Sequence, residues 1–230
     1  MIIQLSVSKK LINCDLGECL IPSPDADIMP LIGMANIACG GHAGNDESMI
    51  KTLKLAKQHR VKIGAHPSYA DQSNFGRVSH PLNNEEMYDL IYQQVLHFQK
   101  LCDDNDTTLE YVKPHGALYH DMMEKPWILN VIVKAIQAID QNLSLVVQAG
   151  VKNFGNNANV TFLHEVFADR GYNGVEMLAR GEKGAVLEDA NAIVEQYQRF
   201  LIEESFNIDT ICFHGDNKAS VEALIRLKNA

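Results

Sequence analysis

Several patterns that would classify this 230-residue sequence at once are missing from it. No uninterrupted apolar run approaches the roughly 20 residues that a membrane-spanning helix needs. At the N-terminus, charges follow a short apolar stretch instead of preceding it, which does not fit a secretory signal. Basic residues are in deficit, with a net charge of -9 and a pI near 5.4, so nucleic acid or an anionic membrane surface is not expected as a partner. We therefore expect a cytoplasmic protein that acts on a small molecule or on another protein.

Common enzyme motifs are also absent. The sequence has no G-x-x-x-x-G-K-[ST] phosphate loop, no G-x-G-x-x-G after a strand, no G-x-S-x-G nucleophile elbow and no H-E-x-x-H zinc helix. A bound nucleotide would therefore not occupy a P-loop. The five cysteines are odd in number, form no C-x-x-C pair and include three in apolar runs, which predicts reduced thiols rather than disulfides.

What the sequence does contain is an alternation of short apolar strands and amphipathic helices, without a linker or a low-complexity segment. With 46% hydrophobic residues the chain can bury a large core. Strands are predicted at 11–16, 37–39, 61–65, 109–113, 143–148, 160–167 and 210–213. Helices are predicted at 25–34, 45–60, 85–103, 127–139, 190–206 and 220–227. The pattern indicates one α/β domain over residues 1–230 with a parallel sheet.

About seven strand and helix pairs fit both an open doubly wound sheet and a closed barrel. The polar residues favour the barrel, because an open sheet gathers its ligand groups at one switch point, whereas a barrel collects them from the ends of many strands. Here nearly every strand ends at an acid or a histidine beside glycine or proline, as in D-L-G-E, C-G-G-H, A-H-P, K-P-H-G and F-H-G-D. We predict a seven-stranded, TIM-barrel-like (β/α) barrel.

Acids and histidines at these strand ends are the first candidates for chemistry. Asp15 and Glu18 flank a glycine, and in a turn they can converge as a metal pair, as general acid and base, or as a grip on a substrate N–H group, although a turn-capping role is the alternative. Four histidines follow apolar strands directly: His42, His66, His115 and His214. One such histidine would be read as structural, but four at equivalent ends predict proton transfer or metal ligation.

The other histidines lie on predicted helix faces or loops and are expected to be solvated: His59, His80, His97 and His120. Cations form a further group of candidates. Lys113 precedes Pro114 at a strand end, where it can hold a carboxylate or polarise a carbonyl. Arg77 and Arg180 can act in the same way from loops, with surface salt bridges as the alternative. Asp216 can orient His214, act directly or cap the last helix.

Six blocks carry a family resemblance: N-C-D-L-G-E, A-N-I-A-C-G-G-H-A-G, I-G-A-H-P-S-Y with F-G-R, V-K-P-H-G-A-L-Y, E-V-F-A-D-R-G-Y and F-H-G-D-N. In this order they resemble the LamB/YcsF family over residues 12–217. The resemblance implies a seven-stranded barrel of the glycoside hydrolase and deacetylase type. It also implies ATP-dependent cleavage of 5-oxoproline to L-glutamate, in a 5-oxoprolinase complex with partner subunits B and C.

Carried over by motif, the candidate catalytic residues are Asp15, Glu18, His42, His66, Lys113, His115 and Asp216. The candidate substrate-binding residues are Asn36, Arg77, Glu165, Asp169, Arg170, Arg180 and His214. ATP is the implied co-substrate. A divalent metal and a homo-oligomer stay open; if a metal binds, its predicted ligands are Asp15, His66 and His115.

The sequence departs from the family pattern in a few places. Asn45 stands where the family usually has Asp, and Asp46 follows it. Ala70 replaces a usual proline, the block V-E-M-L-A-R before Gly181 replaces D-G-x-L-V-P-R, and the sequence ends earlier after its last helix than the family does.

Three functions remain in competition. Phosphorylation of the lactam oxygen by ATP would activate the ring for water, with Asp15, His66 or His115 as base and Lys113 or a backbone N–H stabilising the developing charge. A metal-dependent amide or ester hydrolase is the second function, although the H-x-x-x-H pair of deacetylases is absent. The third is a non-catalytic subunit that binds substrate for its partners.

Overall fold

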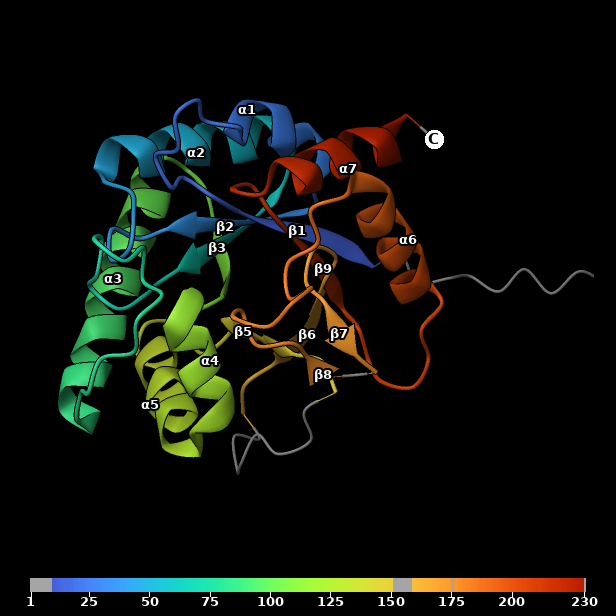
Figure 1. Ribbon diagram of the computed structural model, residues 1–230. Helices are drawn as coiled ribbons and strands as arrows, with labels where there is room; N and C mark the ends of the chain where they lie inside the picture. Colours follow the sequence, from blue (N-terminus) through green and yellow to red (C-terminus); the bar gives the residue numbers. More distant parts are fainter. Residues whose placement is uncertain (1–9, 151–158, 175, 230) are drawn as a thin grey trace, which may run out of the picture.

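The protein is built around a closed barrel of parallel strands. The computed structural model describes residues 10–150, 159–174 and 176–229, so the prediction about the N-terminal residues 1–9 lies outside the described residues. Seven strands run in the order β1-β2-β3-β4-β5-β6-β9 (Figure 1). They are β1 Leu11–Leu16, β2 Met34–Ala38, β3 Lys62–His66, β4 Leu109–Val112, β5 Ser144–Gln148, β6 Phe162–Phe167 and β9 Thr210–His214. Because β1 pairs with both β2 and β9, the sheet closes on itself. The predicted barrel is confirmed and the open sheet is excluded.

Helices surround the barrel, with α2, α3, α5, α6 and α7 on its outside (Figure 1). The helices are α1 Asp25–Ile28, the 3-10 helix η1 Met29–Leu31, α2 Asp46–His59, α3 Asn84–Asp104, α4 Gly116–Glu124, α5 Pro126–Gln137, α6 Ala190–Leu201 and α7 Lys218–Lys228. A small antiparallel hairpin, β7 Tyr172–Asn173 and β8 Glu176–Met177, lies apart from the barrel sheet. Among the described residues, no helix has the length and apolarity needed to cross a membrane.

The long helices begin where the sequence supplies caps. Asn45 accepts a hydrogen bond from the backbone of Ser48, whose hydroxyl in turn accepts one from the backbone of Asn45, which forms a capping box at the start of α2. Asn83 and Glu86 form the same device at the start of α3. Since Asn and Asp are equally good N-caps, Asn45 can replace the usual family Asp without loss of this helix start.

An outer core lies between barrel and helices. Along α3, Ile91, Val95 and Phe98 recur at helical spacing and are all fully buried, as are Leu53 and Ala56 in α2. Each large apolar side chain buried in this way contributes roughly 1.5–3 kcal/mol. This layer fixes the seven strands and hence the positions at which they end.

The interior of the barrel is layered. Side chains alternate along a strand, and a separate apolar cluster of Met34, Tyr111 and Val146 fills one level. Gly64 lies opposite Tyr111 and leaves room for its ring. The next inward positions along two of these strands, Asn36 and Lys113, are polar and buried. The barrel is thus apolar at one level and polar at the next, toward the carboxyl ends of the strands.

Some predicted elements are wrong. The helix expected at 25–34 is broken into α1 and η1, because Pro30 lacks the N–H that a continuing helix would use, and Met34 already begins β2. The helix expected at 190–206 ends at Leu201, after which the Glu203 carboxylate accepts hydrogen bonds from the next two backbone N–H groups and forms a turn. Helix α4 and the β7–β8 hairpin are additions to the predicted set of elements.

Candidate active site

A cavity of about 490 Å³ opens beyond the carboxyl ends of the barrel strands. Most predicted site residues line it: Asp15, Glu18, His66, Arg77, Lys113, His115, Arg170, Arg180, His214 and Asp216. They come from β1, β3, β4, β9 and the loops that follow the strands. Closure of the barrel brings these ends together, which is why residues from opposite ends of the sequence share one wall.

The four other predicted residues lie behind this wall, each bonded to a residue that lines it. Asn36 donates to Asp15 Oδ1 at 2.7 Å, and Glu165 Oε2 lies 3.1 Å from Lys113 Nζ. His42 contacts Glu18, and Asp169 contacts His214. These residues are buried. Their contacts orient the lining residues, so they support the site from behind instead of facing the cavity.

Asp15 and Lys113 form the floor of the cavity. Lys113 Nζ lies 3.2 Å from Asp15 Oδ1 and 3.1 Å from Glu165 Oε2, and it also donates to Asn13 Oδ1 at 3.1 Å. Burial raises the pKa of the Asp15 carboxyl, but the charges of His66 and Lys113 outweigh it, and the net pKa lies well below its usual range. Burial lowers the pKa of Lys113, but the Asp15 and Glu165 carboxylates outweigh it and the net pKa is raised. Asp15 and Lys113 are therefore both charged near neutral pH.

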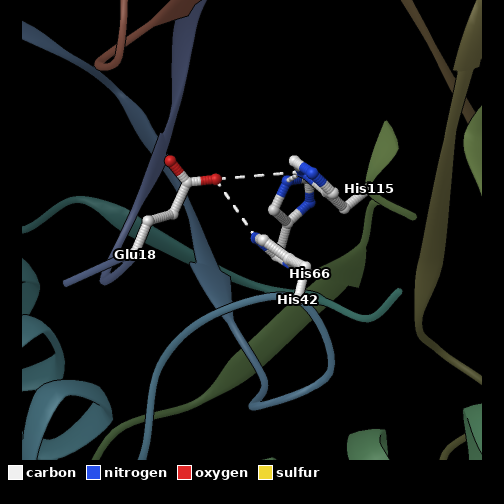
Figure 2. A group of neighbouring side chains, drawn as sticks. All are labelled: Glu18, His42, His66 and His115. Carbon is white, nitrogen blue, oxygen red and sulfur yellow. Dashed lines mark hydrogen bonds and ion pairs between the residues drawn. The ribbon is translucent and has the colours of Figure 1, made fainter. Parts of the chain in front are cut away.

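Three histidines and one glutamate form a second group beside this floor, which we call the His/Glu cluster: Glu18, His42, His66 and His115. Glu18 Oε1 lies 3.2 Å from His42 Nε2 and 3.8 Å from His115 Nδ1, and its carboxylate points toward the imidazole rings (Figure 2). The rings of His42 and His115 stack with centroids 3.6 Å apart. His66 Nε2 lies 3.0 Å from His115 Nδ1.

Burial is the main influence on protonation in the His/Glu cluster. It lowers the pKa of His42 to about 3, and it lowers the pKa of His115 as well, with the neighbouring His66 adding to both effects. For Glu18, burial and the negative charge of Asp15 raise the pKa well above its usual range. The neutral forms of His42 and His115 are therefore favoured, which leaves each ring with one nitrogen lone pair.

His214 and Asp169 form an oriented pair on the opposite side of Asp15. Asp169 Oδ1 lies 2.8 Å from His214 Nδ1, and its Oδ2 accepts from the His214 backbone N–H at 3.0 Å. The second ring nitrogen, Nε2, lies 3.9 Å from Asp15 Oδ2. Burial lowers the pKa of His214, but Asp169 outweighs it and the net pKa is raised. A histidine oriented by a buried carboxylate can carry a proton at neutral pH.

Three arginines surround the cavity, and they differ in their contacts. Arg77 pairs with Asp216 at 2.6 Å. Arg170 is buried and donates to the backbone carbonyls of Leu178 and Ala185, so it positions the segment after the β7–β8 hairpin. Arg180 lies on that segment, and burial together with the charge of Arg77 lowers its pKa. Among the three, Arg180 is therefore the one best placed to bind an anionic group.

Some contributors to the site carry little signal in the sequence. His120 was predicted to be solvated, but it is half-buried and lines the cavity from α4, next to Tyr119. The apolar spacing of Leu118 and Met122 could have revealed this helix. Asn13, which bonds to Lys113 and to Thr210, has no local signal, because an asparagine inside a strand indicates only a weak strand position.

Two compact groups of residues in the described part of the chain could hold a metal ion: the His/Glu cluster, and Asp15 with Cys212 and His214. The trio predicted from the sequence is divided between them, because Asp15 belongs to one group and His66 and His115 to the other. Asp15 still contacts His66, with Oδ2 3.3 Å from Nε2. All five cysteines are free thiols.

The comparisons with known proteins decide the family. A model described as "LamB/YcsF family" matches residues 11–230. The chain belongs to the LamB/YcsF family. One LamB/YcsF relative, from Pseudomonas fluorescens (strain Pf-5) and named as the A subunit of 5-oxoprolinase, is 40% identical over 243 residues that cover 97% of each chain. Another with the same name, from Vibrio cholerae, is 40% identical over 246 residues that cover 97% of this chain and 99% of the relative.

A solved structure shows the same LamB/YcsF architecture. The lactam utilization protein from Thermus thermophilus superimposes with a TM-score of 0.84 at 28% identity, covering 96% of this chain and 97% of that one. The barrel, its loops and the cavity at its carboxyl end therefore belong to one extended fold. The resemblance noted in the sequence blocks is confirmed.

Proposed function

We propose that the chain is the A subunit of an ATP-dependent 5-oxoprolinase, which hydrolyses the lactam of 5-oxoproline to L-glutamate together with partner subunits B and C. The observation that carries this proposal is the floor of the cavity, where Asp15 is held ionised beside the proton-carrying pair His214 and Asp169. Full-length similarity to proteins that bear the name of the 5-oxoprolinase A subunit supports it.

The chemistry needs activation, because a five-membered lactam is a stabilised amide. Transfer of the γ-phosphoryl group of ATP to the lactam oxygen releases ADP and leaves an activated ring carbon. Water then adds to that carbon, the ring C–N bond breaks, and γ-glutamyl phosphate forms. A second water releases phosphate and glutamate, so one ATP and two waters are consumed for each ring opened.

The residues of the cavity fit the steps of ring opening. Neutral His214 can accept the proton of the attacking water through Nε2 while Asp169 holds its other nitrogen, and it can then return that proton to the leaving ring nitrogen. Asp15 Oδ2, 3.9 Å from His214 Nε2, can orient the same water. The depressed pKa of Asp15 makes it a weak base, so we assign it positioning and His214 the proton transfer.

The cations would hold the anionic parts of the reactants. Arg180 and Arg77 lie at the cavity and can bind the substrate carboxylate or the transferred phosphoryl group. A volume of about 490 Å³ is ample for 5-oxoproline with a phosphoryl group. ATP enters this proposal as a co-substrate of the complex, and none of the steps requires a P-loop.

The proposal is tested by co-expressing the chain with subunits B and C and measuring glutamate release from 5-oxoproline with and without ATP. We expect release only with ATP, and a loss of about 10²–10⁴-fold in kcat for His214→Gln, since positioned acid–base groups contribute this much. His97→Gln, an exposed residue of α3, is the matched control. Full turnover by the His214→Gln complex, or binding without any turnover by the complete wild-type complex, would contradict the proposal.

A metal-dependent amide hydrolase is the second candidate, and the compact His/Glu cluster favours it. This function predicts hydrolysis of the lactam, or of simple acetamides, by the isolated chain loaded with a divalent ion and without ATP. The same assay, run on the isolated chain with Zn²⁺ and no nucleotide, separates the two candidates.

A further inference from the structure

The His/Glu cluster presents a hydrogen-bonding pattern that can be read nitrogen by nitrogen. Glu18, His42, His66 and His115 follow or end four different structural segments, and all four are buried. Each imidazole has one nitrogen bonded to a neighbour outside the cluster and one nitrogen directed into it. The outward partners decide which nitrogen carries the proton.

For His66 and His115 the outward partners are backbone carbonyls, which only accept. His66 Nδ1 lies 2.6 Å from the carbonyl oxygen of Lys113, and His115 Nε2 lies 2.9 Å from that of Phe75. Both of these nitrogens therefore donate. In the neutral rings the other nitrogens, His66 Nε2 and His115 Nδ1, carry lone pairs.

For His42 the outward partner is a hydroxyl group whose proton is already engaged. The Ser68 hydroxyl donates to the carbonyl of Tyr69 at 2.9 Å, so it accepts from His42 Nδ1 at 3.0 Å. His42 Nε2 is then the nitrogen with the lone pair, and it faces Glu18 Oε1 at 3.2 Å. All three histidines thus direct lone pairs inward, toward one carboxylate.

This arrangement brings acceptors together without donors between them. His66 Nε2 and His115 Nδ1 lie 3.0 Å apart, and Glu18 Oε1 lies 3.8 Å from His115 Nδ1. Lone pairs at this separation repel one another unless a proton or a cation lies among them. The ligand atoms of all four residues fall within 4.8 Å of one another. With metal–ligand bonds of about 2.0–2.1 Å, the ligand atoms of a tetrahedral site are about 3.3 Å apart.

We propose that Glu18, His42, His66 and His115 form a binding site for one divalent transition-metal ion. Imidazole nitrogens and one carboxylate are ligands that suit Zn²⁺ and its first-row neighbours better than Mg²⁺ or Ca²⁺. The hydrogen bonds from the outward nitrogens to Ser68 and to two carbonyls are the contacts that orient metal-binding histidines. The site differs from the trio predicted from the sequence, because Glu18 and His42 replace Asp15.

The surroundings hold these rings in place. Gly76, at a positive φ of 64°, lies so close to the His42 and His115 side chains that an added methyl group would contact both. Glu18, His66 and His115 line the cavity, whereas His42 lies behind them. An ion bound here would therefore lie at the wall of the cavity. This inference concerns metal binding alone and does not depend on the proposed function.

The test uses the untagged chain, because histidine tags bind the same ions. After dialysis against a chelator, Zn²⁺ is titrated into the chain by calorimetry, and Co²⁺ is added separately to record visible absorption. We expect one ion per chain, with absorption bands typical of nitrogen and oxygen ligands. His42→Ala and Glu18→Gln should weaken Zn²⁺ binding by more than about 100-fold, and Ser68→Ala by about 10–100-fold, since it removes only an orienting contact.

Two controls keep the result interpretable. His97→Ala removes an exposed histidine of α3 that pairs with Asp46 and should leave Zn²⁺ binding unchanged. Asp15→Asn tests the alternative trio and should also leave most of the affinity. Circular dichroism of each variant shows whether it is folded. The proposal is overturned if the wild-type chain binds no Zn²⁺, if His42→Ala binds like the wild type, or if Asp15→Asn abolishes binding while Glu18→Gln does not.

Discussion

The ammonium group of Lys113 and the carboxylate of Asp15 form a 3.2 Å ion pair inside the barrel, with side chains only 3% and 6% exposed. Glu165 adds a second carboxylate at 3.1 Å. Burying one unpaired charge is costly, so each member of this group requires the others. The pair therefore links stability to function, because the charge that stabilises Lys113 also shapes the floor of the cavity.

Replacement of Lys113 by Met should destabilise the protein by about 3–5 kcal/mol, because it leaves two buried carboxylates without their cation. Urea denaturation followed by circular dichroism measures the change. Lys62→Met is the control: Lys62 pairs with Glu110, but these side chains are 53% and 40% exposed, and an exposed pair contributes about 0–1 kcal/mol. Equal effects of the two substitutions would contradict the role assigned to Lys113.

The pair His214 and Asp169 should make stability depend on pH. Because the pKa of His214 is raised in the folded state, the stabilisation by the charged pair is complete below the unfolded pKa of about 6.5 and is lost as the pH rises through the folded pKa. Asp169→Asn should therefore cost more unfolding free energy near pH 6 than near pH 9. Denaturation in the presence of a chelator, at both pH values, measures the difference.

A matched control for this pH effect is Asp46→Asn, which removes the partner of His97. Both side chains of that pair are largely exposed, so solvent screens their interaction. The cost of Asp46→Asn should be small and nearly the same at the two pH values. If the cost of Asp169→Asn grows as the pH rises, the assignment of a charged His214 pair is wrong.

Arg180 should govern affinity for the substrate. Arg180→Gln removes a guanidinium group that can make a charge-assisted hydrogen bond to the substrate carboxylate, an interaction of about 1.5–3 kcal/mol. We expect the KM for 5-oxoproline to rise by about 10–150-fold in the assembled complex, with kcat nearly unchanged. Arg199→Gln, an exposed arginine of α6, should leave both constants unchanged. A fall in kcat at constant KM would instead indicate a role in the chemical step.

Gly64 should be required for barrel packing. A methyl group at this position would meet the ring of Tyr111, which is fully buried and donates to Asn36 at 2.8 Å. Gly64→Ala should therefore cost about 1–3 kcal/mol of unfolding free energy through overpacking. Gly181→Ala is the control, because nothing lies within 4 Å of its added methyl group. Thermal denaturation of both variants tests the prediction, which fails if Gly64→Ala is as stable as the wild type.

The fold is predictable to a large extent because its signals are local. Apolar runs such as the one that contains Ile37 and the helical spacing of Ile91, Val95 and Phe98 follow directly from which faces must be buried. Boundaries are less predictable. Pro30 and the turn at Glu203 end helices that the apolar pattern alone would continue. Helix α4 escapes prediction because it is short and begins directly after the polar residues of a strand end.

The site is predictable as a set of residues and not as an arrangement. The sequence by itself determined that Asp15, His66, His115 and His214 follow buried strands, because an apolar run that stops at a polar residue is visible in one dimension. Only the tertiary structure decided which of them meet. Closure of the barrel places Asp15 beside Lys113 and His214, and it places Glu18 with the stacked rings of His42 and His115. Such groupings depend on strand register and on the tautomer that each outward hydrogen bond selects, and neither is encoded in the spacing of residues along the chain.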